Sequence, residues 1–173
     1  TSISEKMTPD ENFTFLNNYL DALAPAIKDN NGFIDKYVGD AVMALFTNNG
    51  DDPVKAAIAM NLRLNELNHR SKNNKNEKVR MGVGIHCGNL ILGTIGQEER
   101  METTVISDTV NASARLETLN KIYGTKILIS SQLKSNLSDE LMTYTRLIDN
   151  TQVKGKTDFV EVYEVFAADD ENL

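Results

Sequence analysis

Three short segments of the sequence carry polar residues whose types and spacing could bind ions or anionic groups. In the first, Lys36 and Asp40 lie four residues apart, and Gly39 precedes the aspartate. A carboxylate at the tip of a hairpin suits a hard cation such as Mg²⁺, which binds one or two carboxylates together with substrate phosphates. The alternative is an ordinary turn, because glycine and aspartate are both common in tight turns.

The second segment places Asn111 and Arg115 four residues apart in a stretch that reads as a helix. Residues at this spacing share a helix face. An amide one turn from a guanidinium could hold an anion or stabilise a developing negative charge. The alternative is a solvated polar face on which Arg115 pairs with a surface glutamate.

The third segment contains Lys154 and Lys156 on either side of a glycine, just before the last expected strand. Taken alone it reads as a surface turn, since lysines are mostly exposed. The single cysteine, Cys87, has no neighbouring base in the sequence, and we assign no role to His86 or His69.

The composition describes one ordinary globular domain, which we expect to span residues 1–173. The chain has 18 basic and 25 acidic residues and a formal charge of −7, so its overall field repels nucleic acids and anionic membranes. A polyanionic substrate must therefore be held by local cations or a metal. No apolar stretch reaches the roughly 18 residues of a membrane span, so we expect no direct membrane insertion. The unpaired thiol fits a reducing compartment, and we expect this domain to lie in the cytoplasm, whether or not its parent protein is tethered to a membrane.

The elements that must position these residues are predicted by turn and periodicity signals. Thr8, Pro9 and Glu11 form a helix start, with a cap, a proline at the first position and a glutamate three residues after the cap. That helix ends near Gly32. Strands 33–38 and 41–46 then form a tight hairpin, and a second helix begins at Asp52.

The second half of the chain predicts further strands and helices. Strand 79–85 is expected to pair with 90–92, and residues 97–102 to form a charged loop. The remaining expected elements are strand 104–106, helix 108–123, strand 127–130, helix 132–137, and strands 142–147 and 159–166. The pattern is typical of an α+β fold with a mostly antiparallel sheet covered by helices.

Together these segments resemble one family, the class III adenylyl/guanylyl cyclase catalytic domain. The resemblance is carried by residues 32–46, 82–88, 104–117 and 153–156 and covers nearly the whole chain. It implies a ferredoxin-like-derived, mostly antiparallel sheet covered by helices. It also implies a reaction in which the ribose 3′-hydroxyl of ATP attacks its own α-phosphorus, giving cyclic AMP and pyrophosphate.

The resemblance implies roles for the polar residues. Asp40 matches one of two aspartates that hold two Mg²⁺ or Mn²⁺ ions. Asn111 would orient the ribose, and Arg115 would stabilise charge at the α-phosphate. Lys154 would contact the outgoing phosphates.

Two further residues match the base pocket of the family. Lys36 favours adenine, because adenine N1 accepts a hydrogen bond whereas guanine N1 carries a proton. Thr104 is the companion position, and its hydroxyl can accept from the adenine amino group or donate to a guanine carbonyl, so it discriminates less. Threonine there resembles the prokaryotic and soluble-cyclase branch.

The family works as a head-to-tail dimer with its sites at the interface, so the partner implied here is a second copy of the same domain. The family's first strand, which carries the other metal aspartate, would lie upstream of Thr1, and we expect the chain to be an N-terminally truncated part of a larger signalling protein. Two alternatives remain, a catalytically inactive nucleotide-binding or dimerisation module and a guanylate cyclase.

Overall fold

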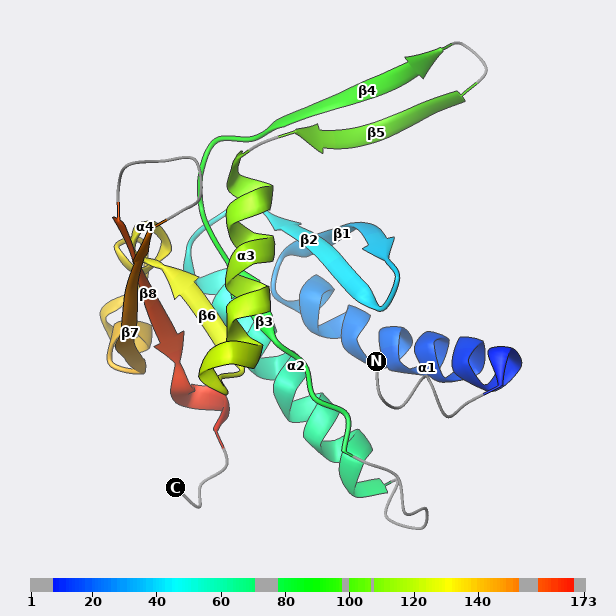
Figure 1. Cartoon of the computed structure of the whole chain (residues 1–173), viewed down its shortest axis with the longest axis horizontal. Coiled ribbons are helices and arrows are strands. Elements are labelled where there is room, and N and C mark those ends of the chain that lie inside the picture. The colour runs from blue at the N-terminus through cyan, green and yellow to red at the C-terminus, as the bar shows by residue number, and fades with distance from the viewer. Residues whose placement is uncertain (1–7, 71–77, 98–99, 107, 153–158, 170–173) are drawn as a thin grey trace. The chain divides into compact units, whose positions relative to one another are not determined.

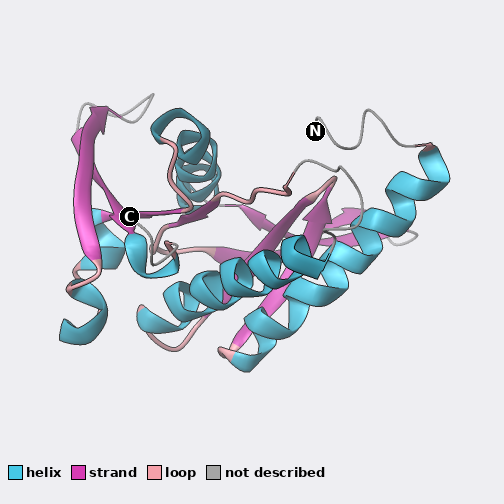
Figure 2. Ribbon diagram, turned by 90° about the horizontal axis from the view of Figure 1, so that it is seen from below, coloured by secondary structure: helices cyan, strands magenta, loops and turns pink. Residues whose placement is uncertain are grey.

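The chain divides into two compact units of helices and strands. The computed structural model describes residues 8–70, 78–97, 100–106, 108–152 and 159–169 (Figure 1). One unit comprises the described parts of Thr1–Met81 and Ala167–Leu173, and the other is Gly82–Phe166. Both units contain helices and strands, which agrees with the predicted α+β class (Figure 2). Within the described stretches, no helix combines the length and apolar character that a membrane crossing requires.

Helix α1 (Pro9–Asp29) begins where the sequence predicts. The backbone N–H of Glu11 donates to Thr8 Oγ1 at 3.4 Å, and the backbone N–H of Thr8 donates to the Glu11 carboxylate at 2.9 Å. Hydrogen bonds from Thr8 lower the pKa of Glu11 below its ordinary value, with the larger contribution from the Thr8 backbone and the smaller from its side chain. The helix ends before Asn31, whose φ of 61° turns the chain out of the helix.

Strands β1 (Gly32–Val38) and β2 (Ala41–Phe46) form the predicted antiparallel hairpin. Its two-residue tip is Gly39 and Asp40, and Gly39 has a φ of +63°, a conformation that glycine adopts without strain. The register shifts between Ile34 and Lys36, so the hairpin contains a β-bulge.

Helix α2 (Asp51–Arg70) follows the hairpin and starts one residue before the predicted position. It packs against α1: Arg63 of α2 donates to the carbonyl oxygen of Ala22 at 3.4 Å and pairs with Asp29 at 3.1 Å. The buried apolar residues of the two helices are Leu23, Ala26, Ile27, Val54, Ala56, Ala57 and Leu64.

The second unit is built on a four-stranded sheet in the order β3-β6-β8-β7. Its strands are β3 (Val83–Ile85), β6 (Ile127–Ser130), β7 (Thr145–Gln152) and β8 (Phe159–Val165). Strand β3 runs parallel to β6, whereas the pairs β6–β8 and β7–β8 are antiparallel. Helix α3 (Asp108–Tyr123) packs on this sheet through a core of Leu116, Leu128 and Val162.

Two short helices, α4 (Ser131–Lys134) and α5 (Asp139–Met142), connect β6 to β7. Each is capped by a serine: Ser130 Oγ accepts from the backbone N–H of Leu133, and Ser138 Oγ accepts from that of Leu141. The 3₁₀ helix η3 (Phe166–Ala168) follows β8. The sequence predicted one helix over 132–137 and a strand from 142, and the second short helix was missed.

Two predictions for the middle of the chain are wrong. Residues 90–92 do not pair with strand 79–85: β3 spans only Val83–Ile85 and pairs with β6. Strands β4 (Ile91–Gln97) and β5 (Arg100–Ile106) instead pair with each other in unbroken antiparallel register, where a charged loop over 97–102 was expected. Alternation shows that a segment suits a strand but does not identify its partner, so the nearest candidate was chosen in error.

Candidate active site

The β1–β2 hairpin carries Lys36 and Asp40. Lys36 lies in β1 opposite Met43 and is half-buried, while Asp40 is exposed at the turn. An exposed carboxylate on a tight turn is open to a cation, and a carboxylate oxygen is a donor that Mg²⁺ and Mn²⁺ prefer. The donor chemistry at Asp40 therefore fits a divalent metal. Among the described residues, no group of three or more His, Cys, Asp or Glu side chains could hold a metal ion by itself.

Tyr19 of α1 interacts electrostatically with Asp40. Burial, and after it the negative charge of Asp40, raises the pKa of Tyr19 to about 12. Tyr19 is stacked on Phe15 with ring centroids 6.4 Å apart. The sequence analysis missed this residue, because no motif marks it and only the fold brings it into the field of the hairpin tip.

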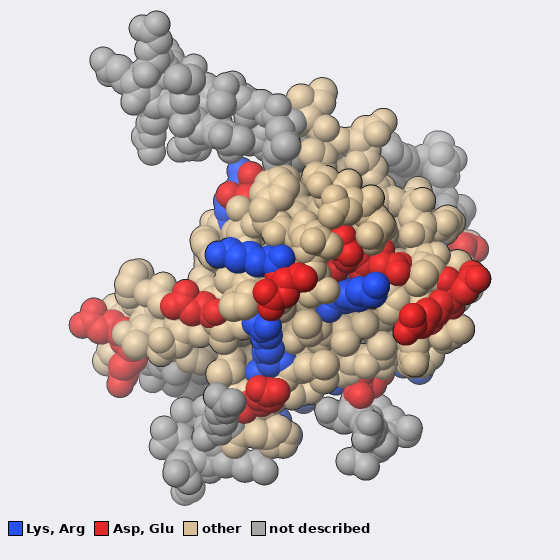
Figure 3. Space-filling view, turned by 180° about the vertical axis from the view of Figure 1, so that it is seen from behind, with Lys and Arg blue, Asp and Glu red and all other residues tan. Residues whose placement is uncertain are grey.

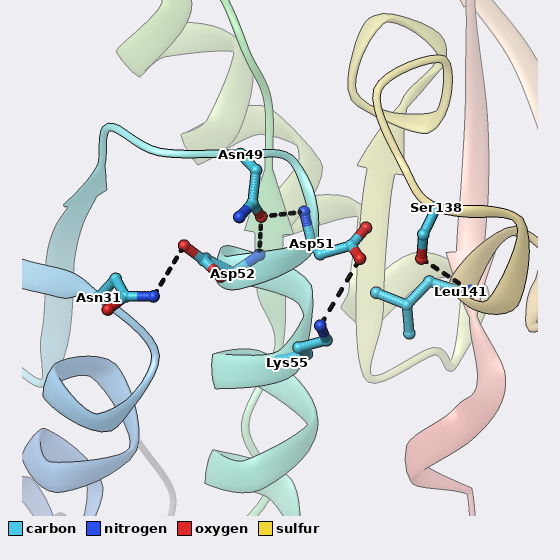
Figure 4. A network of polar contacts seen from close by, with 7 residues as sticks. All are labelled: Asn31, Asn49, Asp51, Asp52, Lys55, Ser138 and Leu141. Carbon is cyan, nitrogen blue, oxygen red and sulfur yellow. Dashed lines mark hydrogen bonds and ion pairs between the residues drawn. The ribbon is translucent and has the colours of Figure 1, made fainter.

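Polar contacts tie together the two ends of the hairpin. Asn31 precedes β1, and its Nδ2 donates to the carboxylate of Asp52, at the start of α2, at 3.1 Å (Figure 4). Asn49 Oδ1 accepts from the backbone N–H groups of Asp51 and Asp52 at 2.9 and 3.0 Å, which satisfies donors in the first turn of α2. The chain entering the hairpin is thereby hydrogen-bonded to the chain leaving it.

Helix α3 carries Asn111 and Arg115, as predicted. Asn111 is exposed in the first turn, and Arg115 lies one turn further on and is half-buried. The spacing of four places the amide and the guanidinium on one side of the helix. Asn111 lies in the first turn, where the backbone dipoles favour a negative ligand.

Close packing of β3 fixes the position of α3. A Cβ at Gly84 would overlap the backbone nitrogen of Glu117 and the carbonyl oxygen of Ser113, so strand and helix approach at a distance that only glycine allows. Asn120, which is 3% exposed, donates from Nδ2 to the carbonyl oxygen of Val83 at 3.0 Å. Its Oδ1 accepts from Thr125 Oγ1 at 2.9 Å. The helix that bears Asn111 and Arg115 is therefore held by buried contacts.

The remaining residues that the sequence singled out are Thr104, Lys154 and His86. Thr104 lies in β5 and pairs with Gly93 of β4. Lys154 lies outside the described residues. His86, which received no role, has Nδ1 2.8 Å from Oγ of the buried Ser130.

The surface charges are mixed in sign. On the face drawn in Figure 3, the Lys and Arg side chains of the described residues lie among Asp and Glu. Those residues therefore form no extended basic surface on that face.

A second residue that the sequence analysis missed is Asp35, next to Lys36. Lys36 Nζ lies 3.4 Å from Asp35 Oδ2. Neighbouring residues of a regular strand point to opposite faces, so the sequence alone gives no reason to pair them.

Comparison with known proteins identifies the family. The family model described as the adenylate and guanylate cyclase catalytic domain matches residues 1–166. An adenylate cyclase of Anabaena cylindrica is 43% identical over 173 residues, covering 96% of this chain and 34% of that protein. The terminal-differentiation-specific adenylate cyclase of Dictyostelium discoideum is 39% identical over 178 residues, covering 99% of this chain and 8% of that protein. The chain thus spans about a third of the first relative and under a tenth of the second.

A solved structure agrees with this family. The guanylyl cyclase Cya2 matches with a TM-score of 0.78 and 31% identity, over 95% of this chain and 84% of that chain. The predicted class III cyclase fold is confirmed by this likeness and by the α+β architecture. From the matched residues and the fold, the chain belongs to the adenylate and guanylate cyclase catalytic domain family.

Proposed function

We propose that the chain is the adenylate cyclase domain of a larger signalling protein and converts ATP to 3′,5′-cyclic AMP and pyrophosphate. One observation carries the proposal. Within a chain of this family, Lys36 and Asp40 lie on one hairpin, and Asn111 and Arg115 lie one turn apart on α3. The two similar proteins named as adenylate cyclases support the choice of ATP.

In this reaction the 3′-oxygen of the ribose forms a bond to the α-phosphorus, and the bond from that phosphorus to the bridging oxygen of pyrophosphate breaks. The hydroxyl proton is lost to solvent or base. Asn111 would orient the ribose so that its 3′-oxygen is in line with the leaving group. Arg115 would donate hydrogen bonds to the α-phosphate oxygens as negative charge develops there. Lys154 would contact the departing phosphates.

Asp40 would hold divalent cations, two Mg²⁺ or Mn²⁺ ions shared with a further carboxylate. Such ions, when bound, neutralise phosphate charge and favour ionisation of the 3′-hydroxyl. The exposed carboxylate at the hairpin tip supports this assignment.

Base selection would rest on Lys36 and Thr104. The Lys36 ammonium donates to adenine N1, an acceptor, whereas guanine presents an N–H there. The chain is similar in structure to a guanylyl cyclase, so the fold alone does not determine which base is selected. The selection must therefore depend on these side chains.

We further propose that both compact units of the chain form one catalytic domain. Two copies of this domain would share their sites at a head-to-tail interface. Asp40 of one copy would face Lys36, Thr104, Asn111 and Arg115 of the other. Each hairpin would then serve two sites, with its tip in one and its strand in the other. Neither copy could act alone.

The test is product formation by the full-length protein with Mn²⁺ and either ATP or GTP, followed by chromatography of the cyclic nucleotides. The expected result is cyclic AMP from ATP and much less cyclic GMP from GTP. Binding of ATP by calorimetry without any product would instead identify a non-catalytic nucleotide-binding module. Equal turnover of both nucleotides would contradict the role given to Lys36.

A further inference from the structure

The β-bulge in β1 places Asp35 and Lys36 on the same side of the strand. In the hairpin register Ile34 pairs with Ala44 and Lys36 pairs with Met43, so Asp35 is the extra residue. Neighbouring side chains of a regular strand point to opposite faces, and a bulge removes this alternation locally. The separation of 3.4 Å between Lys36 Nζ and Asp35 Oδ2 is the direct consequence.

Burial distinguishes the two side chains. The Asp35 side chain is only 7% exposed, while that of Lys36 is 38% exposed. The carboxylate is therefore almost completely removed from water, and the lysine beside it still reaches the surface.

The buried carboxylate depends on this lysine. Within the part of the chain that the structure describes, Asp35 Oδ2 accepts no hydrogen bond. A carboxylate removed from water is costly unless a charge faces it. The Lys36 ammonium supplies that charge, so the attraction holds a long and flexible side chain close to one place.

We propose that Asp35 is a positioning residue that fixes the Lys36 ammonium for recognition of the adenine base. The inference rests on the proposed function, in which Lys36 contacts that base. An ammonium has three donors, so one can face Asp35 while another reaches adenine N1. An anchored ammonium also cannot swing away from the N1 proton of guanine, and Asp35 therefore increases discrimination against GTP.

The experiment compares ATP with 1-deaza-ATP, in which a C–H group replaces N1, in the full-length protein and in its Asp35→Asn variant. Asparagine keeps the shape of the side chain and removes the charge. Initial rates and calorimetric affinities are measured for both nucleotides. The expected result is about a tenfold fall in kcat/KM for ATP, mainly through KM, with less than about a twofold change for 1-deaza-ATP.

The analogue separates positioning from general damage to the fold. A loss of folding would lower kcat/KM for both nucleotides. Loss of the lysine position would lower kcat/KM only for ATP, the nucleotide that has N1. The matched control is Asp51→Asn, which breaks a similar aspartate–lysine pair in α2, with Lys55 Nζ 3.6 Å from Asp51 Oδ2. The ratio of kcat/KM for ATP to kcat/KM for 1-deaza-ATP should not change in that variant.

Lys36→Met distinguishes failure of this inference from failure of the proposed function. If Lys36→Met reduces the ratio and Asp35→Asn leaves it unchanged, Lys36 reads the base and the role of Asp35 is overturned. Equal losses for both nucleotides in Asp35→Asn would also overturn it. If Lys36→Met leaves the ratio unchanged, or the wild type neither binds nor converts ATP, the proposed base contact itself fails and the positioning role fails with it.

Discussion

The β1–β2 hairpin and helix α3 both carry proposed site residues, but they hold them in different ways. The hairpin relies on local devices: a left-handed glycine at its tip, a bulge, and the hydrogen bond from Asn31 to Asp52. Helix α3 relies on buried contacts with β3, through Gly84 and Asn120. Substitutions at the base of α3 should therefore act mainly on stability, and substitutions in the hairpin mainly on the chemistry.

The largest effect is expected at Gly84. Gly84→Ala places a Cβ against backbone atoms of α3 that cannot rotate away, and we expect a loss of about 3 kcal/mol in the free energy of unfolding. The measurement is urea denaturation.

Gly39→Ala is the matched variant in the hairpin. A Cβ at Gly39 meets no described atom within 4 Å, so only its φ of +63° opposes the substitution, at about 1 kcal/mol. Equal losses at the two positions would remove the contrast between close packing and local conformation.

The loss expected at Asn120 is smaller than that at Gly84. Its amide donates to the carbonyl oxygens of Val83, Leu116 and Glu117, and Asn120→Ala removes this donor. We expect about 2 kcal/mol of destabilisation in the same assay. Thr118→Ala is the control, because Thr118 bonds to its own helix at an exposed position. A loss at Asn120 no greater than that at Thr118 would show that the amide does not hold the strand against the helix.

The smallest effect concerns Tyr19 and Asp40 in the first unit. The pKa of Tyr19 is raised to about 12, so the folded protein keeps a proton that the unfolded chain loses near pH 10. Stability from this group is complete below about pH 10 and is lost as the pH rises toward 12. Asp40→Asn should lower the Tyr19 pKa while leaving it above 10, because burial is the larger cause.

The measurement is ultraviolet titration of the phenols, with Tyr19→Phe identifying the signal. An unchanged Tyr19 pKa in Asp40→Asn would show that the charge of the hairpin tip does not reach α1.

The same two regions show what the sequence could predict. Cap, turn and periodicity signals are local, and they located α1, the hairpin, α3 and β6 to within three residues. The pairing of β3 with β6 joins residues more than 40 positions apart, and no local signal encodes it. Strands β4 and β5 were also not recognised from the sequence, because they contain residues of low strand propensity. These are glycines at 93 and 96 and charged residues at 100 and 102.

The site residues were found through family motifs and not through geometry. Lys36, Asp40, Asn111 and Arg115 stand in the elements that were predicted for them, and their roles remain predictions. The sequence could not reveal Asp35, because its pairing with Lys36 depends on a one-residue bulge.

The shared site is tested most directly by mixing two variants of the full-length protein, Asp40→Asn and Arg115→Ala. Each alone should form almost no cyclic AMP. In a mixed dimer one site collects both substitutions and the other receives Asp40 and Arg115 intact. After unfolding and refolding together, equal amounts should regain up to about a quarter of wild-type activity, since half of the dimers are mixed and each has one good site. No recovery from variants that refold and dimerise would contradict a site built from two copies.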